Sequence, residues 1–426
     1  DTRPHRSTMA SSGTRVMFVL FLTLVLAVEI ATGVGEGPWL GTDSSNASNP
    51  APASAPASSA EGICLSRVVP YGYQCEEYTV VTQDGYILAM QRIPAGRSGS
   101  SGVGGDKTPV LLQHGLMMDG ATWLLNSPDQ SLAFILADSG FDVWIANTRG
   151  TDQSRGHSWL APDDTAYWDW SWVELAEYDL PAMVNYVYGR TGKRLHFVGH
   201  SLGTLVLLAS FSQQQQLLNT VRSAGLLCPI AYLGHITSTL TKGAADLFAA
   251  EAVYWMGMNE FNPKGIASEK LLQSLCNKPK VDCYHLLASL TGKNCCLNSS
   301  SIDMFLQYVQ PTSTKNMVHL AQMARADTIT KYDYGKLDNL MHYGHLNPPS
   351  YDMSAIPADF PLFISYGGLD ELADVTDVSR LLGILDSAGA DSQIQYQKSY
   401  AHMDFVMGLN ATTDVYDPLV AFFNHH

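Results

Sequence analysis

Positive charge is scarce in this sequence. Its 426 residues contain 25 Lys and Arg against 40 Asp and Glu, which gives a formal net charge of −15 at pH 7. That sign opposes binding to phosphate backbones, so a nucleic acid is not expected as a partner. Charged residues make up only 15% of the chain and hydrophobic residues 46%. This balance excludes a disordered or coiled-coil protein and allows a large core, in one large α/β domain or two smaller domains.

Long apolar runs are also rare. The one long run, Val16–Val28, follows a basic residue and precedes small residues. Its thirteen residues would reach about 20 Å as a helix, short of the roughly 30 Å of a membrane core. Residues 9–35 are therefore predicted to be a secretory signal peptide, with a transmembrane anchor as the alternative. Residues 36–63, rich in Pro, Ala and Ser, are predicted to be a disordered linker.

Three Asn-x-Ser/Thr sequons are consistent with the secretory route. They lie at Asn46, Asn298 and Asn410, and each is a candidate glycosylation site. The expected destination is extracellular, or a vacuolar or lysosomal compartment.

Cysteine is sparse as well, with seven residues. That number is too small for a disulfide-built miniprotein but sufficient for several bonds and one thiol in an oxidising compartment. Cys228 ends a predicted buried strand and is expected to be free, whereas Cys64 and Cys75 can close a short loop. A bond between the adjacent Cys295 and Cys296 would be strained, so each is expected to pair outward. The candidate partners, with both connectivities open, are Cys276 and Cys283.

Short apolar runs alternate with helical patterns in most of the chain, which predicts an α/β fold with a mostly parallel sheet. The predicted strands are Val110–Gln113, Phe141–Ala146, Leu195–Val198, Ala224–Cys228, Pro361–Tyr366 and Gln393–Gln397. Two further β-prone runs within Tyr78–Ile93 surround Asp84 and Gly85, which predicts a hairpin. A helix is expected after Asp179, which can cap it, with Pro181 in the first turn.

The alternation stops between residues 232 and 350. This part is rich in helical patterns and carries apolar clusters at Leu247–Met258 and Ile302–Val309. It is predicted to be a helical cap or lid, inserted between two parts of an α/β core at residues 64–231 and 351–426. A mobile lid over the site and a rigid cap that completes the core both remain open.

The segment Gly199–Gly203 has the form GxSxG. The pentapeptide alone occurs by chance, but here it follows the predicted strand Leu195–Val198 and precedes an apolar helical pattern. That context is typical of a nucleophile elbow, a tight strand-to-helix turn that exposes a serine. The glycines are needed because a Cβ at either position would clash in the turn. Ser201 is therefore predicted to be a nucleophile.

A serine nucleophile needs a general base, and the base needs an orienting acid. In hydrolases with this elbow, both residues follow the nucleophile along the chain. Asp370 comes after the strand Pro361–Tyr366 and a glycine turn, and His402 comes after the last predicted strand. They are predicted to be the acid and the base, although Asp370 could instead cap a helix. The rival acids are Asp374 and Asp377, while Asp404 lies on the wrong side of His402 in chain order.

Acyl transfer also needs two N–H donors for the oxyanion. The backbone amide of Leu202, directly after the nucleophile, is predicted to be one donor. The amide of Leu116, in the loop after the strand Val110–Gln113, is predicted to be the other. In the same loop, His114 is expected to be structural rather than catalytic.

Other patterns do not indicate a bound cofactor or metal. No group of His, Cys or acidic residues has metal-ligand spacing, and the pair His342 and His345 lacks a third partner. The tryptophans are expected to pack against the sheet rather than to form a ligand platform; they are Trp159, Trp168, Trp170 and Trp172.

Several segments together resemble the acid lipase family, the α/β-hydrolases that include gastric and lysosomal acid lipases and their plant-type relatives. The segments are HGLMMD at 114–119, GHSLG at 199–203, GLDELADV at 368–375, AHMDFVMGL at 401–409, KNMVHLAQ at 315–322 and YDYG at 332–335. The resemblance runs from about Cys64 to Phe423, through core and cap. It implies hydrolysis of neutral lipid esters by Ser201, Asp370 and His402.

The expected activity is thus a serine lipase that acts at a lipid–water interface on acylglycerols or sterol esters through an acyl-enzyme. No protein partner is expected. Animal members have Gln where this chain has Leu202. Because the oxyanion contact uses a backbone amide, this difference should spare catalysis, but it leaves substrate preference open. The alternatives are a ligand-binding protein on a hydrolase scaffold and an acyltransferase that uses the same acyl-enzyme.

Overall fold

The computed structural model describes residues 62–97, 107–263 and 283–426. The predicted signal peptide at 9–35, nearly all of the predicted linker, and Asn46 and Cys276 lie outside these residues. Among the described residues, no helix combines the length and the apolar character that a membrane span requires.

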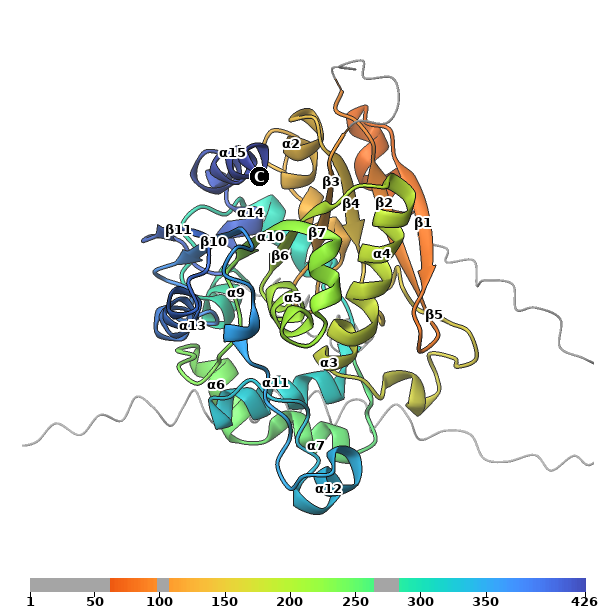
Figure 1. Cartoon of the computed structure of the whole chain (residues 1–426), viewed down its shortest axis with the longest axis vertical. Helices are drawn as coiled ribbons and strands as arrows, with labels where there is room; N and C mark the ends of the chain where they lie inside the picture. The colour runs from red at the N-terminus through yellow and green to blue at the C-terminus, as the bar shows by residue number, and fades with distance from the viewer. Residues whose placement is uncertain (1–61, 98–106, 264–282) are drawn as a thin grey trace, which may run out of the picture. The chain divides into compact units, whose positions relative to one another are not determined.

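A nine-stranded sheet organises the described residues, in the order β1-β2-β4-β3-β6-β7-β10-β11 with β5 paired to β2 (Figure 1). Its strands are β1 Glu76–Val81, β2 Tyr86–Ile93, β3 Pro109–Gln113, β4 Asp142–Ala146, β5 Gly156–His157, β6 Leu195–His200, β7 Val221–Leu227, β10 Leu362–Gly367 and β11 Ser392–Gln397. All pairings from β4 to β11 are parallel, whereas those of β2 are antiparallel. The predicted α/β class, the hairpin and the six predicted strands are confirmed.

The register of the parallel strands brings their carboxyl ends to one edge of the sheet. Gln113 of β3 aligns with Gly199 of β6, and His200 aligns with Leu227 of β7. Ser365 of β10 aligns with the same Leu227. Residues that follow these strands therefore gather at one edge, although some of them lie more than a hundred positions apart in the chain.

Helices cover both faces of the sheet, which explains why every residue of β3, β4 and β6 is buried. They are α2 Leu132–Asp138, α4 Leu180–Thr191, α5 Leu202–Gln213, α13 Val375–Ser387 and α15 Asp417–His425, with the short α3 Trp172–Glu174 and α14 Asp404–Met407. In the view of Figure 1, α4 and α5 cross in front of the strands. On the other face, Phe423 of α15 stacks on His196 of β6.

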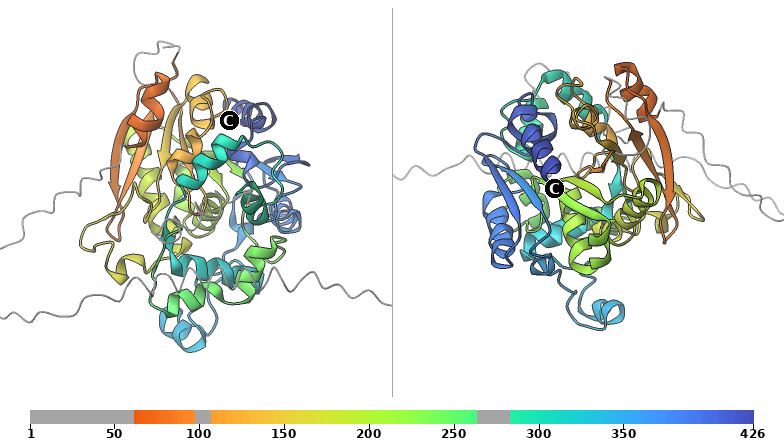
Figure 2. Two further views of the ribbon diagram at one scale, coloured as in Figure 1. Left: turned by 180° about the vertical axis from the view of Figure 1, so that it is seen from behind. Right: turned by 45° about the horizontal axis from the view of Figure 1, so that its top comes forward.

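Residues 232–350 add no strand to the nine-stranded sheet within the described part of the chain. Their elements are α6 Thr239–Asp246, α7 Ala249–Trp255, β8 Glu260–Phe261, α9 Cys283–Thr291, α10 Ser299–Gln307, β9 Thr312–Ser313, α11 Thr314–Ala326 and α12 Lys336–Tyr343. Strands β8 and β9 pair with each other, and α6, α7 and α11 pack together at the bottom of Figure 1. Figure 2 shows the same elements from two further sides.

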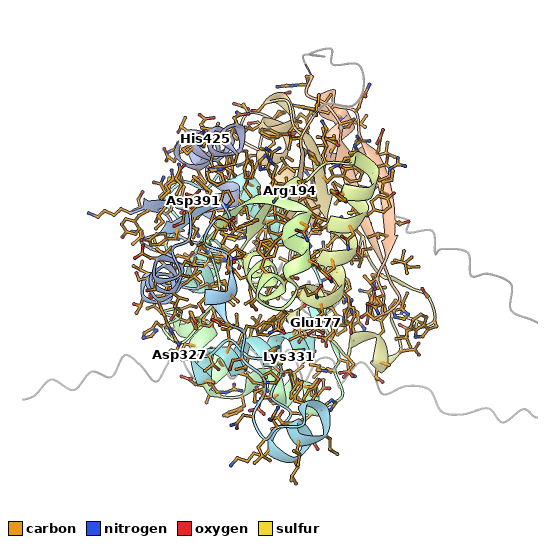
Figure 3. All side chains as sticks on the ribbon, viewed as in Figure 1. Glu177, Arg194, Asp327, Lys331, Asp391 and His425 are labelled. Atoms are coloured by element: carbon orange, nitrogen blue, oxygen red, sulfur yellow. A yellow bond between two sulfur atoms is a disulfide. The ribbon has the colours of Figure 1, made fainter. Side chains whose placement is uncertain are left out.

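Ion pairs tie this region to the sheet-bearing part. Lys331 Nζ lies 2.6 Å from Glu177 Oε1, and both residues are labelled in Figure 3. Arg155 Nη1 lies 2.9 Å from Glu260 Oε1 of β8. The boundaries of the predicted cap, at residues 232 and 350, remain a prediction.

The cysteines confirm two predictions and correct a third. Cys64 is bonded to Cys75, and Cys228 is a buried free thiol. Cys295 and Cys296 are bonded to each other, so the prediction that each pairs outward is wrong. The backbone turn that permits this bond is held from outside, because the N–H groups of both cysteines donate to the carboxylate of Asp404. The side chain of Cys283 is not among those described.

Candidate active site

Ser201 occupies a tight turn between β6 and α5. Its backbone has φ 54° and ψ −120°, a conformation that a non-glycine residue adopts rarely and at some cost. A Cβ added to Gly199 would lie 2.8 Å from the backbone carbon of Gly203, and one added to Gly203 would lie 2.6 Å from the carbonyl oxygen of Gln113. Both glycines are thus required by close backbone approach, as expected for an elbow.

Asp370 and His402 meet at the same edge of the sheet. His402 Nδ1 donates to Asp370 Oδ2 at 2.8 Å, and both side chains are buried. The N–H groups of Leu372 and Ala373 donate to Asp370 Oδ1. Because Nδ1 carries the proton in this pair, the other ring nitrogen of His402 is left as an acceptor, as a general base requires.

The charge state of Asp370 follows from these contacts. Burial by itself would raise the pKa of this carboxyl. Its interaction with His402 and the three hydrogen bonds that it accepts outweigh burial, so the pKa lies below its usual range. Asp370 is consequently a carboxylate that can orient the imidazole and stabilise its protonated form.

The rival acids are engaged elsewhere. Asp374 accepts a hydrogen bond from the N–H of Thr376 at the start of α13. Asp377 accepts one from His235 Nδ1 at 2.8 Å. Of the three aspartates considered, the structure therefore joins Asp370 to His402.

The loop after β3 passes directly over the nucleophile. A Cβ added to Gly115 would lie 3.1 Å from Ser201 Cβ, so only glycine allows this approach without displacement of a neighbour. Leu116 and Leu202 line the same small cavity beside the turn. The structure thus brings the two predicted oxyanion residues to one place, next to Ser201.

His114 holds this loop in place. Its Nδ1 donates to the carbonyl oxygen of Gly115 at 2.8 Å, and its Nε2 accepts the N–H of Thr148 at 3.2 Å. Burial lowers the pKa of His114 to about 4, against the opposing effect of the Gly115 hydrogen bond. A neutral ring with both nitrogens engaged favours the structural role expected for this residue.

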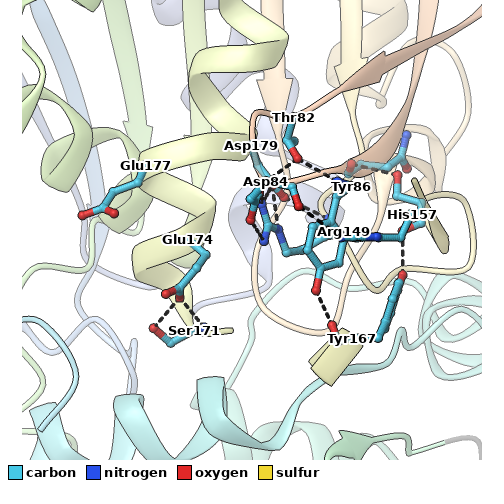
Figure 4. Close-up of polar contacts among 12 residues, drawn as sticks. Thr82, Asp84, Tyr86, Arg149, His157, Tyr167, Ser171, Glu174, Glu177 and Asp179 are labelled. Atoms are coloured by element: carbon cyan, nitrogen blue, oxygen red, sulfur yellow. Dashed lines mark hydrogen bonds and ion pairs between the residues drawn. The ribbon is translucent and has the colours of Figure 1, made fainter. Parts of the chain in front are cut away.

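Thr148, which binds His114, is followed by the buried Arg149 and its ion network (Figure 4). The guanidinium of Arg149, next to Thr148, binds Asp84 at 2.6 Å and Asp179 at 2.6 Å. It also lies 3.8 Å from the ring centroid of Tyr86. The prediction that Asp179 caps α4 is wrong, because its carboxylate binds Arg149 and its backbone is already helical.

Sequence reasoning missed the residues that hold the main chain of His402. The carbonyl oxygen of His402 accepts a hydrogen bond from His200 Nε2 at 3.1 Å and lies 3.5 Å from Cys228 Sγ. Its N–H donates to the carbonyl oxygen of Thr291, the last residue of α9. A histidine before the nucleophile and a thiol at a strand end were visible in the sequence, but no spacing rule connects them to position 402.

The tryptophans and the candidate metal ligands are explained by packing and by bonds within the chain. Trp168, Trp170 and Trp172 are buried, whereas Trp159 is exposed, so three of the four pack inside the protein, and Trp172 stacks on His319 of α11. Three groups of potential metal ligands occur among the described residues: His200, Cys228 and His402; Cys295, Cys296 and Asp404; and His235, Asp327 and Asp377. Each group contains side chains already bonded within the protein, to Asp370, in the disulfide, or between His235 and Asp377.

Comparison with known proteins agrees with this geometry. A family model described as "alpha/beta hydrolase fold" matches residues 108–382, and one described as "partial alpha/beta-hydrolase lipase region" matches residues 66–127. Triacylglycerol lipase 2 of Arabidopsis thaliana is 53% identical over 368 residues, which covers 85% of this chain and 88% of that protein. Gastric triacylglycerol lipase of Mus musculus is 36% identical over 370 residues, covering 84% and 90%.

A solved structure supports the fold independently. A thermostable carboxyl esterase from Bacillus coagulans aligns with a TM-score of 0.52 at 12% identity, over 82% of this chain and 98% of that one. At this identity the likeness concerns the fold alone. The family model and the relatives show that the chain belongs to the acid lipase family of the α/β-hydrolase fold, as a plant-type member and a carboxylic ester hydrolase.

Proposed function

We propose that the chain is a secretory-pathway serine lipase that hydrolyses neutral lipid esters through an acyl-enzyme. The observation that carries the proposal is the hydrogen bond between Asp370 and His402, buried at the strand edge that also bears the Ser201 turn. Relatives named triacylglycerol lipase support acylglycerols as substrates, with sterol esters as a second ester class to be assayed.

The reaction proceeds in two halves. Ser201 Oγ attacks the ester carbonyl while His402 accepts the serine proton, and the amides of Leu116 and Leu202 bind the oxyanion. Collapse of the tetrahedral species breaks the ester C–O bond, and His402 returns the proton to the departing alcohol. Water then attacks the acyl-enzyme with His402 again as base, which releases the fatty acid and restores the Ser201 hydroxyl.

The cap is proposed to govern access to this site. Leu247 and Phe248, between α6 and α7, are exposed, and Phe248 adopts a left-handed backbone conformation with φ 53°. Ile302 of α10 is buried, and Met304, Phe305 and Leu306 are partly buried against the core, so this second apolar cluster is less exposed than the first. The arrangement supports α6 and α7 as the mobile, lipid-facing part, and the rigid cap remains the alternative to be tested.

The secretory route and the glycosylation of Asn298 and Asn410 belong to the same proposal. Both asparagines lie in described parts of the chain, and Asn298 accepts the N–H of Ser300 at the start of α10. The Cys64–Cys75 and Cys295–Cys296 bonds are consistent with an oxidising compartment. The final destination is proposed to be extracellular, vacuolar or lysosomal.

One experiment tests the activity. The purified protein is assayed against emulsified long-chain triacylglycerol, a sterol ester and a soluble short-chain ester. Ser201→Ala and His402→Ala should each lower kcat by about 10⁴-fold or more without unfolding the protein. His425→Ala, at an exposed histidine near the chain end, should match the wild type. Substantial turnover by folded Ser201→Ala would overturn the proposal.

A further inference from the structure

The carboxylate of Asp404, two residues after His402, is fully buried and accepts three backbone hydrogen bonds. Asp404 Oδ2 accepts the N–H of Ala401 at 2.8 Å and that of Cys295 at 3.0 Å. Asp404 Oδ1 accepts the N–H of Cys296 at 3.1 Å. A buried carboxylate is tolerated only where such donors fill its lone pairs, so this one fixes three amides at once.

The three amides belong to two segments that are distant in sequence. Ala401 directly precedes His402, whereas Cys295 and Cys296 follow α9, more than a hundred residues earlier. The disulfide between Cys295 and Cys296 fixes both of their amides relative to each other. Asp404 thus joins the loop of His402 to the disulfide-bonded turn at Cys295 and Cys296.

Other contacts join the same two segments, residues 291–296 and the loop of His402. The N–H of His402 donates to the carbonyl oxygen of Thr291, and the N–H of Met403 donates to Asn294 Oδ1 at 3.1 Å. Gly292, with φ 92°, has room for no Cβ, because one would collide with the carbonyl oxygen of Leu369, the residue before Asp370. The segment therefore touches the loops of both the acid and the base.

We propose that Asp404 is a positioning residue for the general base: by binding Ala401, Cys295 and Cys296, it holds His402 where its ring binds Asp370, at the sheet edge that bears the Ser201 turn. Asp404 acts through the main chain, since its side chain binds amides and not the imidazole. The inference rests on the proposed function, because it assumes that His402 is the base.

The test is Asp404→Asn. An amide side chain keeps the size of the carboxylate but has one acceptor oxygen, so it cannot accept all three N–H groups and turns an NH₂ group towards one of them. On a soluble short-chain ester, kcat should fall by about 10²-fold with KM nearly unchanged, because a displacement of about 1 Å at a catalytic group has that effect. The rate at which a reactive phosphonate ester modifies Ser201 should fall in the same proportion.

Asp142→Asn is the matched control. Asp142 is also a buried carboxylate with three donors, from Arg92 Nε, Arg92 Nη2 and Trp144 Nε1, but it lies on β4 away from the site. Asp142→Asn should lower Tm while leaving kcat and the rate of phosphonate modification unchanged. If both variants lower Tm and neither changes kcat, Asp404 has only a structural role and the proposal is overturned.

A second variant keeps the proposal testable if Asp404→Asn does not fold. Asn294→Ala removes the acceptor for the N–H of Met403, another hydrogen bond between the same two segments. It should also lower kcat without raising KM. Wild-type kcat in folded Asn294→Ala would then overturn the proposal. The proposed function is judged separately: if Ser201→Ala is inactive but Asp404→Asn retains wild-type kcat, the positioning role alone is wrong.

Discussion

The sheet core and the helical region at residues 232–350 treat their apolar side chains differently. Every residue of β3, β4 and β6 is buried. In the helical region, Leu247 is 61% exposed, and Trp255 of α7 and Met341 of α12 are each 77% exposed. Burial explains the composition of the core, but packing does not explain why α7 and α12 carry large apolar residues towards solvent. Under the proposed function, the core performs the chemistry and the helical region meets the lipid.

The largest expected effect is in the core, at the acid. Asp370→Asn should lower kcat by about 10⁴-fold on long-chain and short-chain esters alike, because the amide no longer fixes the tautomer of His402. The measurement is kcat on both substrates, with circular dichroism as a check on folding. Asp374→Asn, at the cap of α13, should leave kcat unchanged. A larger loss in Asp374→Asn than in Asp370→Asn would reassign the acid.

The next largest effect is on stability, and it compares an ion network within the core with an ion pair between the two regions. Arg149→Met removes the partner of the buried Asp179 and should lower the free energy of unfolding by about 3–5 kcal/mol. Arg155→Met breaks the partly exposed pair with Glu260 of β8 and should cost about 1 kcal/mol or less. Urea unfolding of both variants measures the difference. Equal losses would show that the two regions are joined as firmly as the core itself.

A smaller expected effect is the loss of folding stability at acidic pH that the buried histidines of both regions cause. Burial lowers the pKa of His200 in the core and of His319 in α11 to about 3 each. Below the unfolded value of about 6.5, the unfolded state binds more protons than the folded state, so stability is lost as the pH falls from about 6.5 towards 3. At pH 5 each such histidine costs about 2 kcal/mol.

His319→Gln tests this pH dependence. The variant should lose stability at pH 7.5, because His319 contacts Ser171 and Thr330, but its stability should fall less steeply towards pH 5 than that of the wild type. Unfolding in urea at several pH values gives the slope. An unchanged slope would mean that His319 does not take up a proton on unfolding in this range.

The smallest effect sharpens the comparison at the surface. Replacing Leu247 and Phe248 with serine should lower the rate on emulsified long-chain triacylglycerol several-fold and leave Tm and the short-chain rate nearly unchanged, because both side chains are exposed. Leu65→Ser is the control, because Leu65 is also exposed but lies outside the helical region, in the sheet-bearing part of the chain. Equal losses on both substrates would support a rigid cap.

Local patterns made the core predictable. A strand, two glycines and a helix in direct succession predict the Ser201 turn, and the strand ends predict Asp370 and His402. What was wrong or missed depends on residues far apart: Asp179 binds Arg149 instead of capping α4, and Asp404 holds the turn that allows the Cys295–Cys296 bond. Such contacts have no periodicity or spacing in one sequence, so propensity rules favoured the local alternatives.

Under the proposed function, the order of the strands along the chain also sets when activity can arise during synthesis. The strands up to β7 and the Ser201 turn precede residue 232 in the chain, whereas Asp370 and His402 follow the helical region. Because chains begin to fold from the N-terminus while they are being made, the nucleophile can be in place before its acid and base exist. A nascent chain would thus stay inactive until β10 and β11 have joined the sheet and brought Asp370 and His402 to the edge that bears Ser201.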